Sequence, residues 1–364
     1  MPPSAPAAPD ALATVDRLLR DAVTAGASDI HLDPSADGVE VRMRRDGLLQ
    51  HTEQLSAEAG RAAIARLMVM GGLLTYRLDV PQEGRMQAVV QQGGGASRLI
   101  EARVAVMPTT HGLRAVVRLP AELTQPRDLE ALQLPPRVLD GLRRFADADA
   151  GLLLVTGPAG SGKTTTLYAL LEWIAQRHAG LSIISLEDPV ERDLPGVTQI
   201  EVRPFGELTY ERALKSVLRQ DPQVLMLGEI RDRATASIAV QAALSGHRLV
   251  STMHAGSPGG AIARLLEMGL EPYQITSALF GVVAQRLLRR RSGDGYEGRI
   301  PAAAIATIDA ELRRCILQRD DEATLQRALQ SSDAYQDLRA SARTLVEQGV
   351  TDEEEMTRVM GADA

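Results

Sequence analysis

Residues 157–165 of this 364-residue chain read Gly157, Pro158, Ala159, Gly160, Ser161, Gly162, Lys163, Thr164 and Thr165. The first eight fit the pattern G-x-x-x-x-G-K-S/T, which is typical of a phosphate-binding loop. An apolar run at 152–155 precedes the loop, and a helix-like segment follows it at 165–174. Because such a loop needs a strand before it and a helix after it, the stretch predicts a nucleotide-binding α/β domain.

The residue types in the loop suit phosphate chemistry. The three glycines permit turns that aim backbone N–H groups at phosphate oxygens, and the following helix directs its positive end at the same charge. Lys163 is placed to reach the β- and γ-phosphates, and Thr164 offers a hydroxyl to Mg²⁺. We therefore expect ATP and Mg²⁺ as ligands of this segment.

Composition excludes several other classes of protein. Hydrophobic residues make up 45% and charged residues 24%, which is ordinary for a soluble protein. The 3% aromatic content and the net charge of −7 argue against a protein that coats nucleic acid. Cys315 is the only cysteine, so we expect no disulfide, no zinc and a reducing, cytoplasmic setting. No stretch approaches the ~20 apolar residues of a membrane span.

The pattern changes along the chain predict five segments. Residues 1–10 are rich in proline and alanine and are expected to be disordered. Residues 11–120 alternate in the manner of a small α+β domain with a mostly antiparallel sheet, and prolines mark 121–136 as a linker. Strands alternate with helices over 137–290, which predicts a parallel sheet. From about residue 261 the chain is expected to be mainly helical, with 291–364 as a helical C-terminal subdomain.

Two acidic positions follow apolar strands. Glu229 ends the run that begins at Gln223, which places a carboxylate where the edge of a parallel sheet faces a nucleotide and its metal. Glu187 begins the acidic stretch that continues to Glu191, and a carboxylate there can orient a water for attack on a γ-phosphate. The alternatives are a solvated carboxylate at a strand end and an acidic surface loop.

Four ordered stretches resemble the secretion ATPase family that powers type II secretion and type IV pilus systems. They are the phosphate loop at 157–167, an acidic box at 186–191, a second nucleotide motif at 218–232 and a histidine box at 244–269. Upstream, residues 28–34, 41–47, 81–85 and 102–108 resemble the PAS-like N-terminal domain of that family. The resemblance implies a PAS-like α+β domain joined to a RecA-like P-loop ATPase domain with a helical C-terminal subdomain.

The resemblance assigns roles to the loop and the acids. It implies that residues 157–165 bind the nucleotide, with Lys163 and Thr164 on the phosphates and Mg²⁺. Glu229 would support the metal directly or through a water, and Glu187 would position the attacking water. In this family, therefore, the two carboxylates have different tasks.

The resemblance also implies sensors and partners. His254 and His247 would sense the state of the nucleotide, and Arg103 and Arg118 match arginines that the N-terminal domain directs at it. The family works as a homo-hexameric ring in the cytoplasm that drives a polytopic inner-membrane platform protein. Membrane contact would occur only through partners, among them other secretion or pilus assembly components, and no nucleic acid is expected.

Three departures from the family pattern bear on function. Only about ten residues precede the first expected helix, so a region that docks other members to the membrane complex is not expected here. The segment after residue 284 lacks the four cysteines of a zinc module. Residues 254–257 read His-Ala-Gly-Ser where His-Thr-Asn is usual, although the phosphate-handling positions are intact. The C-terminal stretch at 338–360 favours assembly or secretion over retraction.

Two other functions stay open on the sequence alone. The basic residues Arg286, Arg289, Arg290 and Arg291 could belong to a nucleic-acid translocase or a conjugation-type ring. The altered residues after His254 could belong to a regulator that binds ATP with little turnover. Salt-dependent DNA affinity would revive the first alternative, and a nucleotide-bound ring without turnover would support the second.

Overall fold

The structure is a computed structural model, and it describes residues 10–91, 97–120, 128–203, 206–332 and 335–361. The chain divides into two compact units, Met1–Gln125 and Pro126–Ala364. Residues 1–9 of the predicted tail, the glycine-rich turn predicted at 93–95 and residues 121–127 of the predicted linker lie outside the described residues. Within the described ranges, no helix combines the length and the apolar character needed to cross a membrane.

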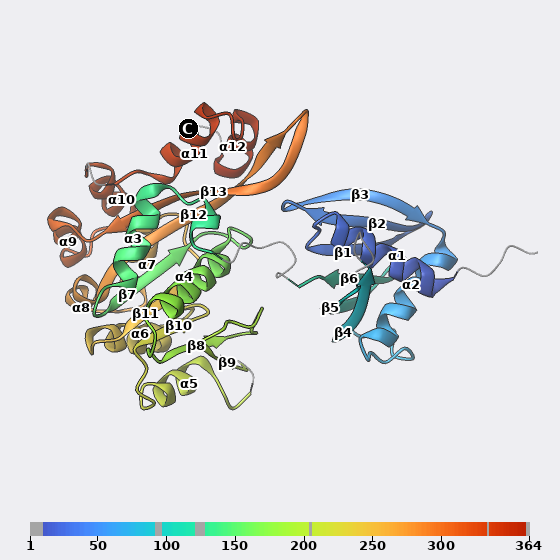
Figure 1. Ribbon diagram of the computed structural model, residues 1–364, viewed down its shortest axis with the longest axis horizontal. Helices are drawn as coiled ribbons and strands as arrows, with labels where there is room; N and C mark the ends of the chain where they lie inside the picture. Colours follow the sequence, from blue (N-terminus) through green and yellow to red (C-terminus); the bar gives the residue numbers. More distant parts are fainter. Residues whose placement is uncertain (1–9, 92–96, 121–127, 204–205, 333–334, 362–364) are drawn as a thin grey trace, which may run out of the picture. The chain divides into compact units, whose positions relative to one another are not determined.

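The first unit is built on one antiparallel sheet of order β3-β2-β1-β6-β5-β4 (Figure 1). Its elements are α1 (Ala11–Thr24), β1 (Asp29–Ser35), β2 (Gly38–Arg45), β3 (Leu48–Leu55), α2 (Ala57–Met70), β4 (Gln82–Gln91), β5 (Ser97–Thr109) and β6 (Gly112–Arg118). Along β5, buried residues such as Ile100 and Val104 alternate with exposed ones such as Leu99 and Arg103. The buried set packs with residues of both helices, such as Leu18 of α1 and Ile64 of α2, so the helices cover one face of the sheet. Arg103 lies on the opposite face, which we call the open face although Asp29 and His31 of β1 are buried there. The α+β domain with an antiparallel sheet is confirmed.

The second unit has a seven-stranded sheet of order β13-β12-β7-β11-β10-β8-β9. All neighbouring pairs are parallel except β12 with β13. The strands are β7 (Gly151–Thr156), β8 (Ile183–Glu187), β9 (Thr198–Glu201), β10 (Val224–Leu227), β11 (Arg248–Met253), β12 (Leu279–Ser292) and β13 (Gly295–Thr307). The parallel sheet predicted from alternating strands and helices is confirmed.

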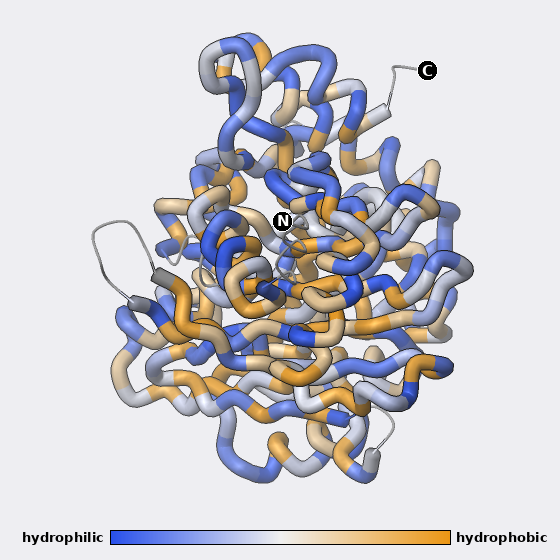
Figure 2. Tube along the Cα trace, turned by 90° about the vertical axis from the view of Figure 1, so that its right-hand side faces the viewer, coloured by the Kyte–Doolittle hydropathy of each residue, from blue (hydrophilic) through white to orange (hydrophobic). Residues whose placement is uncertain are grey.

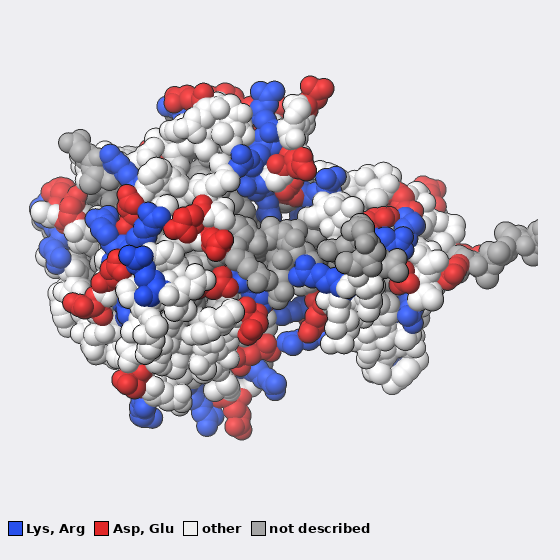
Figure 3. Space-filling view, viewed as in Figure 1, with Lys and Arg blue, Asp and Glu red and all other residues white. Residues whose placement is uncertain are grey.

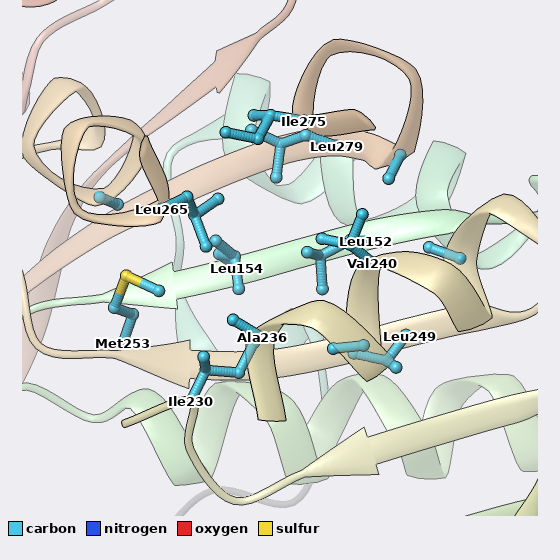
Figure 4. Packing of buried hydrophobic residues seen from close by; sticks show 14 of the residues in the cluster. Leu152, Leu154, Ile230, Ala236, Val240, Leu249, Met253, Leu265, Ile275 and Leu279 are labelled. Atoms are coloured by element: carbon cyan, nitrogen blue, oxygen red, sulfur yellow. The ribbon is translucent and has the colours of Figure 1, made fainter. Parts of the chain in front are cut away.

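Helices cover both faces of this sheet. They are α3 (Pro136–Ala146), α4 (Lys163–Arg177), α5 (Tyr210–Val217), α6 (Arg233–Leu244), α7 (Pro258–Glu267), α8 (Pro272–Ala278), α9 (Ala310–Leu317), α10 (Glu322–Gln330), α11 (Leu338–Glu347) and α12 (Glu353–Met360), with a short 3₁₀ turn, η2 (Glu130–Leu132). Leu152 and Leu154 of β7 pack in one core, with Val240 of α6 (Figure 4), while Leu153 and Val155 pack in another. Two-sided burial explains why β7 is apolar throughout. In Figure 2, which colours the trace by hydropathy, hydrophobic stretches in orange alternate with hydrophilic ones in blue.

The expectation of a mainly helical chain from residue 261 is wrong for residues 279–307. These residues form the long hairpin β12–β13, and β12 inserts beside β7 in the parallel sheet. The segment has no clean alternation because most of it is buried on both sides, and its alanines at 302–304 favour helices in isolation. Pairing of β13 with β12, and of β12 with β7, outweighs that local preference. The boundary predicted at residue 290 falls inside β12, and the helices α9 to α12 follow the hairpin.

Candidate nucleotide-binding site

The phosphate loop joins the carboxyl end of β7 to the start of α4. Gly160 and Gly162 have φ of +75° and +89°, in the left-handed region that favours glycine. A Cβ atom at Gly162 would lie 2.7 Å from Nε2 of Gln285, and one at Gly157 would lie 2.5 Å from the backbone oxygen of the same residue. Gln285 belongs to β12. The hairpin that the sequence did not predict therefore packs against the phosphate loop.

The loop has the unfilled polar groups that an anion would satisfy. The side-chain oxygen of Ser161 is buried and has no hydrogen-bond partner among the described residues. Helix α4 starts at Lys163 without a side-chain cap, so its first N–H groups face the loop. Nζ of Lys163 donates at 2.9 Å to the backbone oxygens of both Gly157 and Pro158. The arrangement fits a bound phosphate, which Lys163 could reach by leaving these carbonyls.

Glu229 lies just beyond β10, close to Lys163. Burial lowers the pKa of Lys163, the charge of Glu229 opposes that shift, and the charge of Arg286 adds to it. Glu229 pairs with Arg231, and Nε2 of His254 is 3.6 Å from its Oε2. The structure therefore brings Lys163, Glu229 and His254 together at the carboxyl edge of the sheet.

The residues present fit a magnesium ion. Thr164 provides a hydroxyl that makes no hydrogen bond to the described residues, and Glu229 provides a carboxylate that is 16% exposed. Oxygen donors from one or two side chains, completed by phosphate and water, are what Mg²⁺ prefers. These two residues would hold the ion, which would neutralise charge on the phosphates.

Glu187 ends β8 and is 3% exposed. Its carboxylate accepts hydrogen bonds from Tyr168 on α4, from Oγ of Ser185 at 2.5 Å and from Nε2 of Gln199 at 3.1 Å. A solvated surface loop is therefore not the environment of this acid. The next residue, Asp188, is exposed.

The two histidines lie at opposite ends of β11. His254 follows the carboxyl end of this strand, and Thr156 fixes the next residue by donating to and accepting from the backbone of Ala255, at 2.9 and 3.0 Å. His247 precedes the strand, and its backbone oxygen accepts from the N–H of Gly151, at the start of β7. Its ring contacts the carbonyl of Ala242. This placement separates His247 from the phosphate loop of its own chain, whereas His254 lies at the carboxyl end of β11.

Arg103 and Arg118 lie in the first unit, on the open face of its sheet. They are direct partners in the register of β5 and β6, and Arg85 of β4 is the partner of Arg103 on its other side. Arg118 donates to Asp29 at 3.0 Å, yet its side chain is 74% exposed. Like charges directly opposite each other destabilise a sheet, and here Asp29 beside Arg118 and Glu101, 3.8 Å from Arg85, offset part of that repulsion. The sequence located two of these arginines but not their alignment.

The basic residues of β12 are engaged inside the second unit. Arg286 donates to the backbone oxygen of Gly256 at 3.1 Å, Arg290 pairs with Gln133, and Arg291 lies 3.9 Å from Asp352. Arg289 pairs with Glu355. On the face drawn in Figure 3, basic and acidic side chains are interspersed. The basic stretch therefore carries no separate argument for nucleic acid.

Two tyrosines that the sequence analysis did not predict also belong to the site. Tyr168 contacts Glu187, as described above. A Cβ atom at Gly228 would lie 2.5 Å from the hydroxyl of Tyr210, which places that hydroxyl beside the backbone next to Glu229. Burial raises the pKa of Tyr210, and the charges of Asp188 and Glu229 add to the shift. The sequence indicated only that Tyr168 lies on the helix predicted at 165–174.

A parallel sheet that carries a glycine-rich loop, a lysine at the start of the following helix and a strand-end carboxylate at one edge defines a P-loop ATPase of RecA-like fold. The family model described as "Type II/IV secretion system protein" matches residues 9–358. The chain is 38% identical over 366 residues to the Type II secretion system protein HxcR of Pseudomonas aeruginosa, covering 95% of this chain and 76% of that protein. The chain therefore belongs to the type II/IV secretion family of ATPases.

Other relatives have the same character. The chain is 41% identical over 283 residues to the Type II secretion system ATPase E of Vibrio cholerae and 41% identical over 276 residues to the type IV pilus assembly ATPase PilB of Thermus thermophilus. It covers 55% and 30% of their respective lengths, and they cover 78% and 76% of this chain. Among solved structures, the Legionella pneumophila ATPase DotB aligns with a TM-score of 0.76 at 21% identity, covering 98% of this chain and 97% of that one. The pilus retraction motor PilT with bound ADP aligns with a TM-score of 0.64 at 25% identity, covering 94% and 96%.

Proposed function

We propose that this chain is a cytoplasmic, homo-hexameric motor that hydrolyses ATP to move pilin or pseudopilin subunits. The observation that supports this most directly is the meeting of Lys163, Glu229 and His254 beside an unfilled phosphate loop, in a chain of the secretion ATPase family. The motor acts at the inner membrane through a polytopic platform protein and other secretion or pilus assembly components. Because the relatives include proteins named for secretion and for pilus assembly, we favour these directions of work over retraction.

The residues have separate tasks in this proposal. The backbone of 157–165 and Lys163 hold the β- and γ-phosphates, while Thr164 and Glu229 hold Mg²⁺. Glu187 orients the attacking water, which is a positioning task in phosphoryl transfer. His254, through Glu229, responds to the presence of the γ-phosphate. Arg103 and Arg118 supply positive charge toward a nucleotide.

The test is steady-state ATP hydrolysis together with the native mass of the purified protein. We expect a hexamer that turns over ATP, and we expect Glu187→Gln to lose turnover while it still binds a fluorescent ADP analogue. Lys163→Ala should lose both binding and turnover, because it removes the charge that faces the phosphates. A folded, nucleotide-bound hexamer without turnover, even with membranes that contain its partners, would refute the motor and favour the nucleotide-binding regulator.

A further inference from the structure

A buried network of hydrogen bonds surrounds Glu187. Binding of phosphate by the loop at 157–165 does not depend on this network. Oε1 of Glu187 accepts from Oγ of Ser185 at 2.5 Å and from Nε2 of Gln199 at 3.1 Å, and Oε2 accepts from the hydroxyl of Tyr168. Tyr168 is 1% exposed and Ser185 is fully buried. Such a network fixes the plane of a carboxylate far better than packing alone, because each donor points at a particular lone pair.

The hydrogen bonds leave one acceptor position of the Glu187 carboxylate unused. A carboxylate has about four lone-pair sites, two on each oxygen. Ser185 and Gln199 use both sites on Oε1 of Glu187, whereas Tyr168 uses one of the two on Oε2. One site on Oε2 is therefore left for a further donor such as a water, and the hydroxyl of Tyr168 determines where that site points.

Tyr168 makes two further contacts besides its hydrogen bond to Glu187. Its hydroxyl accepts from the backbone N–H of Glu191 at 3.1 Å, and the guanidinium of Arg192 lies 5.2 Å from the centre of its ring. Arg192 also makes a bidentate ion pair with Glu172, at 2.6 and 3.1 Å, and both of these side chains are buried. Since Tyr168 and Glu172 belong to α4, the acidic segment after β8 is fastened to the helix that starts at the phosphate loop.

We infer that Tyr168, together with Ser185, is a positioning residue that orients the carboxylate of Glu187 for the attacking water and ties it to the phosphate-loop helix. The inference rests on the proposed role of Glu187 in hydrolysis. Tyr168 acts as a donor throughout: burial raises its pKa, and the charge and hydrogen bond of Glu187 add to the shift, so it keeps its proton at neutral pH. A purely structural tyrosine would support the fold without affecting the chemical step selectively.

The experiment compares Tyr168→Phe with the wild-type hexamer in kcat, KM and affinity for a fluorescent ADP analogue. Phenylalanine keeps the ring that packs against Arg192 and removes only the hydroxyl. A hydrogen bond to a charged group is worth enough for a drop in kcat of about ten- to a hundredfold, and we expect ADP affinity to stay within about twofold of wild type. Tyr296→Phe is the matched control, because Tyr296 also donates to a carboxylate, that of Asp352 at 2.8 Å. It should leave kcat unchanged.

The same substitution in a Glu187→Gln background separates the possible outcomes. If Tyr168 acts through Glu187, adding Tyr168→Phe to Glu187→Gln should change the residual rate by less than about twofold. An unchanged or raised kcat in Tyr168→Phe, or an equal drop in both backgrounds, would overturn the inference alone. Full turnover in Glu187→Gln would instead refute the proposed role of Glu187. Should Tyr168→Phe not assemble, Ser185→Ala decides by the same two comparisons.

Discussion

Helix α12 should depend on the charge of one buried acid, Glu355. Its side chain is fully buried, and it accepts hydrogen bonds from the backbone N–H and Nε of Arg289, both at 2.9 Å, and from Arg358 at 2.7 and 2.6 Å. Burial by itself would raise the pKa of Glu355, but the hydrogen bonds from Arg358 and Arg289 outweigh it and lower the pKa to about 2. The carboxylate is therefore the group that fastens α12 to β12.

The magnitude follows from that shift. Each pKa unit is worth about 1.4 kcal/mol, so a fall from about 4.5 to about 2 corresponds to about 3 kcal/mol of stabilisation near pH 7. Glutamine at 355 has nearly the same shape but keeps only one acceptor oxygen, and its NH2 group then faces N–H donors of Arg289 and Arg358. We therefore expect Glu355→Gln to cost about 2–3 kcal/mol. The pKa of Glu355 is lower in the folded protein than in the unfolded chain. Its contribution to stability is thus complete above about pH 4.5 and is lost as the pH falls toward 2.

Amide hydrogen exchange of the peptide that contains α12 measures this locally. At pH 7 we expect exchange in Glu355→Gln to be about 30- to 150-fold faster than in wild type, after correction for intrinsic rates. The difference should shrink when the pH is lowered from 5 to 3. The neighbouring Glu354, which is exposed on the same helix, supplies the control Glu354→Gln with an effect below about 0.5 kcal/mol. Equal protection in the two variants would refute the reasoning.

Two further predictions concern the site and the first unit. Gly228→Ala should sharply reduce ATP turnover, because its Cβ would lie 2.5 Å from the hydroxyl of Tyr210. Tyr210→Phe should restore part of the turnover, and a variant that is not rescued would contradict this steric explanation. Burial and the charge of Arg114 lower the pKa of His31, so the unfolded ring takes up its proton at a higher pH than the folded one. Stability of the first unit should therefore fall as the pH drops below about 6.5, in thermal unfolding between pH 7.5 and 5.5. His31→Gln should flatten that slope, and an unchanged slope would contradict the prediction.

The sequence by itself determined the class of fold and the phosphate chemistry. The glycine spacing before Lys163 has few other uses, and an apolar strand followed by a helix is a local pattern that is readable without tertiary structure. The strand that leads to Glu229 and the antiparallel character of the first unit were predicted from the same kind of local periodicity, and the structure has both.

Features that depend on contacts between distant parts of the chain were decided only by the tertiary structure. Insertion of β12 beside β7 gave strand geometry to residues with good helix propensity and placed Gln285 under the phosphate loop. Register set Arg85 beside Arg103, and strand direction sent His247 and His254 to opposite edges of the sheet. The hydroxyl of Tyr168 met Glu187 only because α4 packs against the end of β8. Contacts between residues far apart in the chain leave little local pattern, so the physical reason is that their energies arise only once the chain has folded.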